Sequence, residues 1–263
     1  MIIDTCLIAC NLNKNYYQYY PLQRIVWKEL CGIQTKLILV GDHIPSYLQP
    51  YADEIILFPP FDGLHDVFLA QILREFYPCV MRESQGIIIS DADMLPMSKR
   101  YYLDTVRDIP QDKFVVYRDG VINQYGEIPM CYIAGSSQAF RNLFKCETVD
   151  DIKQTIKQIA QAHLDSGSTF DGQHGGKGWF VDQWNLFKTL EHHQPASDIV
   201  RLTDHHTGFR RLDRDQQIYW DCLRQHQYDD YHMPRWLPQH LGHIQHIIKE
   251  LLPHVELPTL TFE

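Results

Sequence analysis

The stretch that decides the fold is Gly86-Ile87-Ile88-Ile89-Ser90-Asp91-Ala92-Asp93, in which three β-branched residues lead directly into two carboxylates one residue apart. An uninterrupted β-branched run is typical of a strand that is buried on both faces, as in a parallel sheet. Alternate residues of an extended chain point the same way, so Asp91 and Asp93 can present oxygens to one point. The stretch therefore predicts a central strand with paired carboxylates at its carboxyl end.

Similar apolar runs alternate with helical patterns on either side of this strand. The expected strands are 5–10, 36–40, 54–58, 113–117, 130–134 and 199–203, and the expected helices are 19–30, 67–76, 148–163, 179–190 and 241–252. Thr148 followed by Asp151 is the pattern of a helix capping box. Strands alternating with helices predict an α/β fold with a mostly parallel sheet flanked by helices.

Composition narrows the possible functions. The chain has 263 residues and is 44% hydrophobic, which suits a single globular domain. Its formal charge of −9 disfavours a nucleic-acid-binding protein. Its apolar runs are much shorter than the roughly 20 residues that cross a bilayer, so we expect no transmembrane segment and a soluble, cytoplasmic protein. The seven cysteines are scattered without a C-x-x-C pair, and we expect buried, reduced thiols.

The carboxylates of Asp91 and Asp93 suit a hard divalent cation such as Mg²⁺ or Mn²⁺, which could bridge a diphosphate. A solvated acidic turn or a helix cap is the alternative. In an open α/β sheet, ligands bind beyond the carboxyl ends of the strands, where this pair falls, and this position favours the metal site.

Two further stretches carry polar groups after apolar segments. In the first, 204–211, an imidazole could be a third metal ligand, Gly208 could let the backbone approach a phosphate, and an arginine could pair with it. A surface loop with two ordinary histidines is the alternative. In the second, 179–185, Asp182 either complements a helix dipole or is a catalytic or substrate-binding carboxylate.

Taken together, Ser90-Asp91-Ala92-Asp93, Asp182-Gln183 and the H-x-x-G-x-x-R string His205/Gly208/Arg211 resemble, in order, the motifs of nucleotide-sugar-dependent glycosyltransferases of the GT-A fold. The resemblance is to the retaining family that includes glycogenin and bacterial α-galactosyltransferases. It spans residues 5–211 and implies a Rossmann-like, mixed but mostly parallel sheet. Because the sequence has no internal repeat and no break in composition that would mark a linker, we expect one domain over 1–263, with a nucleotide-binding half (1–110) and a sugar and acceptor half (111–263).

The resemblance implies a metal site and a phosphate site. Asp91 and Asp93, flanking Ala92, would hold Mn²⁺ (or Mg²⁺) on the diphosphate of a UDP-sugar. His205 would be the third ligand, with His206 as the rival. Gly208 and Arg211 would contact the phosphates, Arg211 in the place of the family's usual lysine.

The same resemblance assigns the rest of the donor site. Ala9, Cys10 and Asn11, with Tyr16 or Tyr17 stacking on the base, would form the uridine-binding edge, and Arg74 would contact the donor. Gly135, within Ile133–Ser136, would line the sugar pocket. Asp182 would touch the transferred sugar and Gln183 its reacting face.

The implied reaction is transfer of a hexose, galactose or glucose, from a UDP-sugar to a hydroxyl of a glycan acceptor. The Asp-Gln pair favours retention at the anomeric carbon, whereas inversion would make Asp182 the general base. The segment 165–178, with five glycines, could be a lid that excludes water. The alternatives are a sugar-nucleotide nucleotidyltransferase, whose glycine-rich loop is absent after the first strand, and an inactive module that binds glycans.

Overall fold

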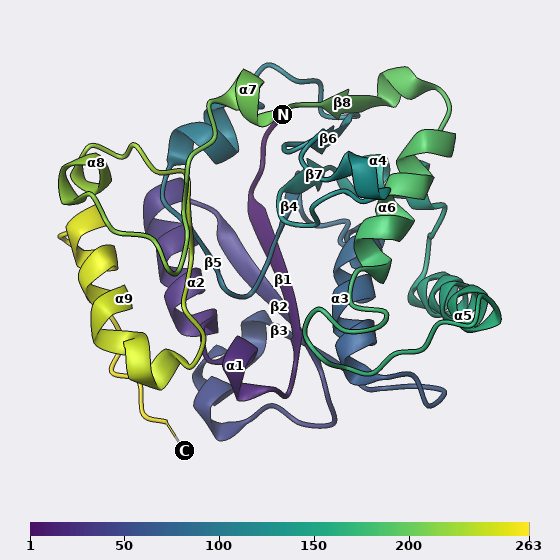
Figure 1. Ribbon diagram of the computed structural model, residues 1–263, viewed down its shortest axis with the longest axis horizontal. Helices are drawn as coiled ribbons and strands as arrows, with labels where there is room; N and C mark the ends of the chain where they lie inside the picture. The colour runs from purple at the N-terminus through teal and green to yellow at the C-terminus, as the bar shows by residue number, and fades with distance from the viewer. Residues whose placement is uncertain (263) are drawn as a thin grey trace.

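The structure is a computed structural model that describes residues 1–262 (Figure 1). Within these residues the strands form a seven-stranded sheet, ordered β3-β2-β1-β4-β7-β6-β8, and a three-stranded sheet, ordered β5-β10-β9. The strands are β1 (Thr5–Asn11), β2 (Gln34–Val40), β3 (Ile55–Phe58), β4 (Ile87–Ser90), β5 (Met94–Pro96), β6 (Phe114–Val116), β7 (Ile133–Gly135), β8 (Ile199–Arg201), β9 (Arg211–Leu212) and β10 (Asp230–His232).

The large sheet is mixed but mostly parallel, which confirms the predicted fold class. Strands β3, β2, β1 and β4 pair in parallel, β7 is antiparallel to both β4 and β6, and β8 is parallel to β6. The polar segment after β4 therefore lies at the same edge of the sheet as the end of β1.

Helices cover both faces of this sheet. The α-helices are α1 (Lys14–Tyr17), α2 (Tyr20–Val26), α3 (Asp66–Phe76), α4 (Ser137–Phe144), α5 (Val149–Asp165), α6 (Val181–His192), α7 (Asp204–Thr207), α8 (Trp220–Arg224) and α9 (Leu237–Leu251). Short 3-10 or π segments are η1 (Trp27–Cys31), η2 (Ser46–Glu54), η3 (Tyr77–Val80), η4 (Arg100–Asp104), η5 (Asn123–Tyr125) and η6 (Ala196–Asp198). Figure 1 shows α3, α4, α5 and α6 on one side of the sheet and α2 and α9 on the other.

Alternation along β4 explains why both faces are covered. Ile87 and Ile89 pack into the core beneath α3, α4, α5 and α6, whereas Ile88 packs into the opposite core with Trp27 and Tyr102. All three isoleucines are fully buried. Complete burial on both sides is what the uninterrupted apolar run predicted.

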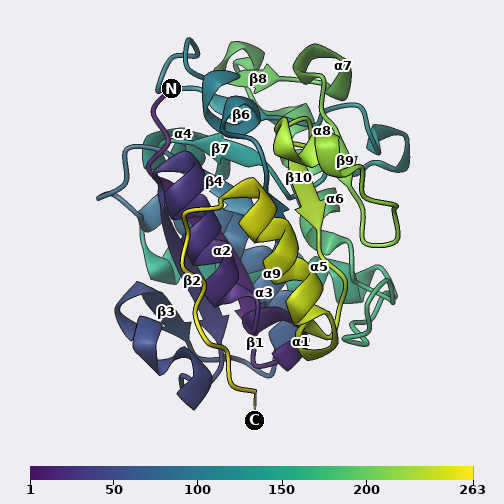
Figure 2. The same ribbon diagram turned by 90° about the vertical axis from the view of Figure 1, so that its left-hand side faces the viewer.

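The small sheet ties the end of the chain to the segment after β4. Residues 94–96 of β5 pair antiparallel with β10, so that His232 lies opposite Met94. Helix α9 packs over α2 in a third core that includes Val26, Ile244 and Ile248 (Figure 2). None of the helices within residues 1–262 combines the length and apolarity needed to span a bilayer.

The expected elements mostly stand within a few residues of their predicted bounds. Helix α9 begins earlier, at Leu237, because Pro238 occupies its first turn. Helix α4 was not predicted; its start is capped by Ser136, whose Oγ accepts a hydrogen bond from the N–H of Ala139 at 3.1 Å. All seven cysteines are free thiols, six of them buried, as predicted.

Candidate donor-binding site

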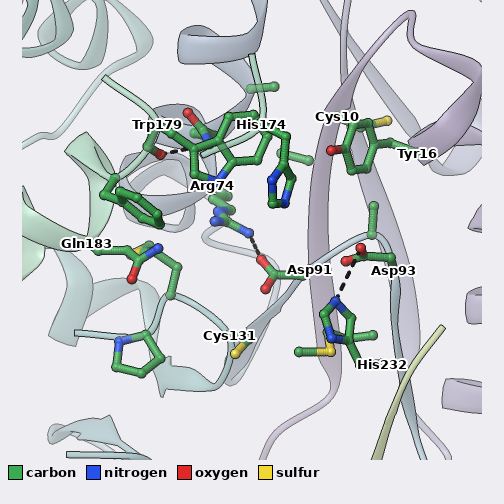
Figure 3. A pocket seen from close by; sticks show the side chains of 18 of the residues that line it. Cys10, Tyr16, Arg74, Asp91, Asp93, Cys131, His174, Trp179, Gln183 and His232 are labelled. Atoms are coloured by element: carbon green, nitrogen blue, oxygen red, sulfur yellow. Dashed lines mark hydrogen bonds and ion pairs between the residues drawn. The ribbon is translucent and has the colours of Figure 1, made fainter. Parts of the chain in front are cut away.

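A cavity of about 440 Å³ opens at the carboxyl ends of β1 and β4 (Figure 3). Many of the predicted site residues line it: Ala9, Cys10, Asn11, Tyr16, Arg74, Asp91, Ala92, Asp93, Gln183 and Arg211. Tyr16 lines the cavity and Tyr17 does not. The parallel pairing of β1 with β4 brings the first and the central predicted motifs to one place.

Asp93 is a buried carboxylate that faces two guanidinium groups and an imidazole. Its Oδ2 lies 3.3 Å from Nη2 of Arg214, 3.5 Å from Nε2 of His232 and 3.8 Å from Nε of Arg235. Burial by itself would raise the pKa of Asp93, but hydrogen bonding from His232 and the charges of His232, Arg214 and Arg235 lower it. Asp93 is therefore ionised at neutral pH and sits in a positively charged part of the cavity.

Arg74 joins the two other carboxylates of the predicted site. Its guanidinium donates to Asp182 Oδ2 over 2.8 Å. It also hydrogen bonds to Asp91 Oδ1 (Figure 3). Asp182 is only 1% exposed and is not among the residues that line the cavity, which differs from the predicted contact with the sugar. Burial raises the pKa of Asp182 and Arg74 opposes that rise. Asp182 thus anchors Arg74, while Gln183 next to it reaches the cavity.

His232 is a site residue that sequence reasoning missed. Its Nδ1 lies 2.9 Å from Asp213 Oδ1, and its Nε2 faces Asp93 and contacts Arg214. A carboxylate on one ring nitrogen fixes the orientation of an imidazole, and in metal sites the other nitrogen is then the ligand. In this structure that nitrogen contacts Arg214, which a bound cation would have to displace. His232 is therefore the imidazole that accompanies the two motif carboxylates.

The structure places His205 elsewhere, which corrects the expected third ligand. His205 and His206 are exposed on α7 and do not line the cavity. Thr203 caps this helix by accepting a hydrogen bond from the N–H of His206, and Gly208 ends it with φ of 67°. Gly208 was expected to approach a phosphate, but here it ends α7 in the left-handed backbone conformation, which favours glycine.

Arg211 and Gly135 also differ from their expected roles. Arg211 lines the cavity, but its guanidinium is held by the fully buried carboxylate of Asp230, at 2.8 Å from Nη2. Gly135 is buried and lies outside the cavity, opposite Ile87 in the register of the sheet. Because β7 runs antiparallel to β4, its end lies beside the start of β4, away from Asp91; Met130 and Cys131, before β7, line the cavity instead.

Further basic side chains of the cavity are ones to which sequence reasoning assigned no role. Arg235 stacks its guanidinium over Tyr16, 5.6 Å from the ring centroid, and its buried Nε has no hydrogen-bond partner within residues 1–262. Arg118 is bound by Asp204, and His174 enters from the loop before α6. His174 lies in the segment 165–178 that was expected as a lid, but neither it nor Arg235 was singled out, because the position of each side chain depends on long-range packing.

The donor set at the cavity fits a divalent cation in its chemistry. Asp93 and His232 converge, and Asp91 is two residues from Asp93, but Asp91 is bound to Arg74. Over the described part of the chain, no three His, Cys, Asp or Glu side chains are already clustered as a metal site. A cation held here would require Asp91 to exchange partners.

Comparisons with known proteins find no matching family model and no matching curated sequence. Several solved structures are similar. Galactosyltransferase LgtC, in complex with donor and acceptor sugar analogues, is 8% identical over 97% of each chain with a TM-score of 0.47. A glycosyltransferase involved in glycosylating the major capsid of PBCV-1 is 10% identical over 93% of this chain and 100% of its own, with a TM-score of 0.49.

The glycosyltransferase GlyE of Streptococcus pneumoniae is 14% identical over 80% of this chain and 47% of its own, with a TM-score of 0.42. All three are glycosyltransferases, the class of enzyme that the sequence motifs resemble. At these identities and TM-scores, the matches assign neither a family nor a substrate to this chain.

Proposed function

We propose that this chain is a glycosyltransferase that moves a hexose from a UDP-sugar to a hydroxyl of a glycan acceptor. The observation that carries the proposal is the cavity at the carboxyl ends of β1 and β4, which combines Asp91, Asp93 and Gln183 with the guanidinium of Arg235, whose Nε makes no hydrogen bond within residues 1–262. Ligands of open α/β sheets bind at such an edge. The segment 1–110 would supply the nucleotide site and 111–263 the sugar and acceptor site.

The cationic side chains suit the departure of a diphosphate. Cleavage of a sugar–phosphate bond builds negative charge on the leaving group, and preplaced positive groups stabilise that charge where it develops. Arg235 stacks over Tyr16 and lies 3.8 Å from Asp93, so it can reach both a base-binding edge and a phosphate. We assign Arg235, rather than Arg211, to the diphosphate because Asp230 holds Arg211 by a hydrogen bond of 2.8 Å, whereas the carboxylate of Asp93 lies 3.8 Å from Arg235.

Asp93, His232 and Asp91 are the residues that would hold Mn²⁺ or Mg²⁺. Asp213 orients His232, and an imidazole ligand suits Mn²⁺ better than Mg²⁺. When bound, such a cation would supply further positive charge for the leaving diphosphate. Arg74 would then be held by Asp182 alone, at 2.8 Å, and its other guanidinium nitrogen would be free to contact the donor.

The start of α6 supports retention of configuration at the anomeric carbon. Inversion needs a general base on the acceptor hydroxyl, and the carboxylate of α6 nearest the cavity, Asp182, is buried against Arg74. The residue of this pair that reaches the cavity is Gln183, whose amide is not a base. Gln183 could steady the sugar while the acceptor attacks from the face that the diphosphate leaves. Galactose and glucose are the proposed donor sugars.

The experiment is a panel of UDP-sugars tested with Mn²⁺ for slow release of UDP in the absence of acceptor. We expect one hexose nucleotide to be hydrolysed above the others. Asp93→Asn should lower that rate at least about 100-fold, because it removes a carboxylate ligand of the proposed cation, whose positive charge would stabilise the leaving diphosphate. Asp42→Asn, at an exposed carboxylate that does not line the cavity, should leave the rate unchanged.

Both variants should first be compared by circular dichroism, so that a folding defect is recognised. Hydrolysis that survives in Asp93→Asn would contradict the proposed site. Binding of UDP without turnover of any sugar nucleotide would contradict the proposed activity and favour an inactive binding module.

A further inference from the structure

The loop between α5 and α6, residues 166–180, has a conformation that is defined by its own hydrogen bonds, and we call it the glycine-rich loop. The carboxylate of Asp171 accepts hydrogen bonds from the N–H groups of Gln173 at 2.9 Å and Lys177 at 3.0 Å. Gly172 and Gly175 have φ values of 69° and 70°, in the left-handed region that favours glycine. The tip of the loop, residues 172–177, thus folds around Asp171.

One aromatic side chain anchors the base of this loop. The Phe170 ring lies between the rings of Phe68 on α3 and His163 on α5, with centroid distances of 4.3 Å and 4.5 Å. On the other side of the tip, Gln71 donates to the carbonyl of Trp179 over 2.9 Å. These two attachments hold the ends of the loop on α3 and leave its tip exposed.

The tip carries His174 into the donor-binding cavity. His174 lines the cavity, and its ring packs against Trp179 with centroids 4.5 Å apart. Figure 3 shows the imidazole between Trp179 and Tyr16, facing the space over Asp91 and Asp93. The fold around Asp171 therefore presents one polar side chain to the part of the cavity assigned to the diphosphate.

The charges around His174 favour an anionic partner. Partial burial and then the charges of Arg235 and Arg214 lower the pKa of His174, while Asp93 acts in the opposite direction. Guanidinium groups across a cavity repel the protonated form of an imidazole, and a phosphate placed between them would attract both and accept a hydrogen bond from the imidazole.

We infer that His174 is a donor-binding residue, which hydrogen bonds to the diphosphate of the nucleotide sugar and so fastens the glycine-rich loop over the cavity. The inference rests on the proposed function and adds a residue outside every sequence motif. A fastened loop would also keep water from the reacting sugar. Phe170 is a positioning residue in this account, since it holds the base from which the tip reaches in.

Binding of UDP and cleavage of the loop by trypsin test this inference together. Lys177 is exposed in the tip, so cleavage after Lys177 reports whether the tip is fastened. In the wild-type chain, UDP with Mn²⁺ should slow this cleavage. His174→Ala should weaken UDP binding about tenfold in calorimetry, the loss expected for one hydrogen bond to a charged group, and should abolish the protection.

Matched variants separate a ligand contact from a change in loop structure. His174→Gln keeps a hydrogen-bond donor and should recover part of the affinity and protection. Gln173→Ala, at an exposed neighbour that does not line the cavity, should behave as wild type. Phe170→Ala should speed cleavage with and without UDP.

The results also distinguish failure of this inference from failure of the proposed function. Wild-type affinity and protection in His174→Ala would overturn the role of His174 while leaving the donor site intact. Absence of UDP binding in the wild-type chain would instead refute the proposed function, and with it the inference.

Discussion

At the scale of single residues, His232 rather than His205 carries the imidazole of the candidate metal site. His232→Ala should therefore raise the Mn²⁺ concentration needed for UDP binding at least about tenfold, because it removes a nitrogen ligand that Asp213 orients. His205→Ala, an equal change on the exposed helix α7, should have no effect. Calorimetric titration of UDP at graded Mn²⁺ concentrations measures both.

The opposite ranking, with loss in His205→Ala and none in His232→Ala, would contradict the assignment. Equal affinity in both variants at every Mn²⁺ concentration would show that the nucleotide binds without an imidazole ligand.

The H-x-x-G-x-x-R spacing of residues 205–211 led to the prediction of a metal and phosphate site, but the end of a helix produces the same pattern. Thr203 caps α7 and Gly208 terminates it, so both residues have structural reasons to be there. His232 reaches Asp93 through the pairing of β10 with β5, in which it lies opposite Met94. A strand of three residues is too short to show a hydrophobic pattern, so β10 could not be predicted from the sequence. The residue that pairs with His232 is Met94, 138 positions earlier in the sequence.

At the scale of elements, local sequence motifs predicted the local structure that they determine, such as the start of a helix. The capping box at the start of α5 is present, with Asp151 N–H donating to Thr148 Oγ1 at 3.1 Å. The direction of β7 has no local signal, because an antiparallel strand has the same apolar run as a parallel one. A strand was correctly predicted at Gly135, but because the strand runs antiparallel to β4, Gly135 does not line the cavity as expected.

The contact between α3 and α6 supports a prediction on pH. Glu75 is fully buried, accepts a hydrogen bond from Asn185 at 2.8 Å, and burial raises its pKa well above its usual range. A carboxyl whose folded pKa is raised contributes stability that is fully present below its unfolded pKa, about 4.5, and is lost as pH rises through the folded pKa.

We therefore expect the free energy of unfolding to fall between pH 5 and pH 8 for the wild type relative to Glu75→Gln, by up to about 1.4 kcal/mol per pH unit. Urea unfolding at several pH values measures the difference. Glu83→Gln, at an exposed carboxylate, is the control and should track the wild type. A constant difference across this range would show that Glu75 is ionised in the folded chain.

At the scale of the whole molecule, the cavity is assembled from segments far apart in the sequence. The end of β1 and the segment after β4 were predictable because parallel strands bring their carboxyl ends to one edge. His174, His232 and Arg235 come from the second half, where the sheet turns mixed and the regular alternation of strands and helices ends. Their positions depend on long-range pairing and loop folding, which a single sequence does not reveal.

The central claim is that this cavity binds the nucleoside diphosphate of a sugar donor. Isothermal calorimetry of UDP, with and without Mn²⁺, tests it most directly. We expect binding with a dissociation constant below about 1 mM and a tighter complex when Mn²⁺ is present. No heat of binding at millimolar UDP in either condition would contradict it.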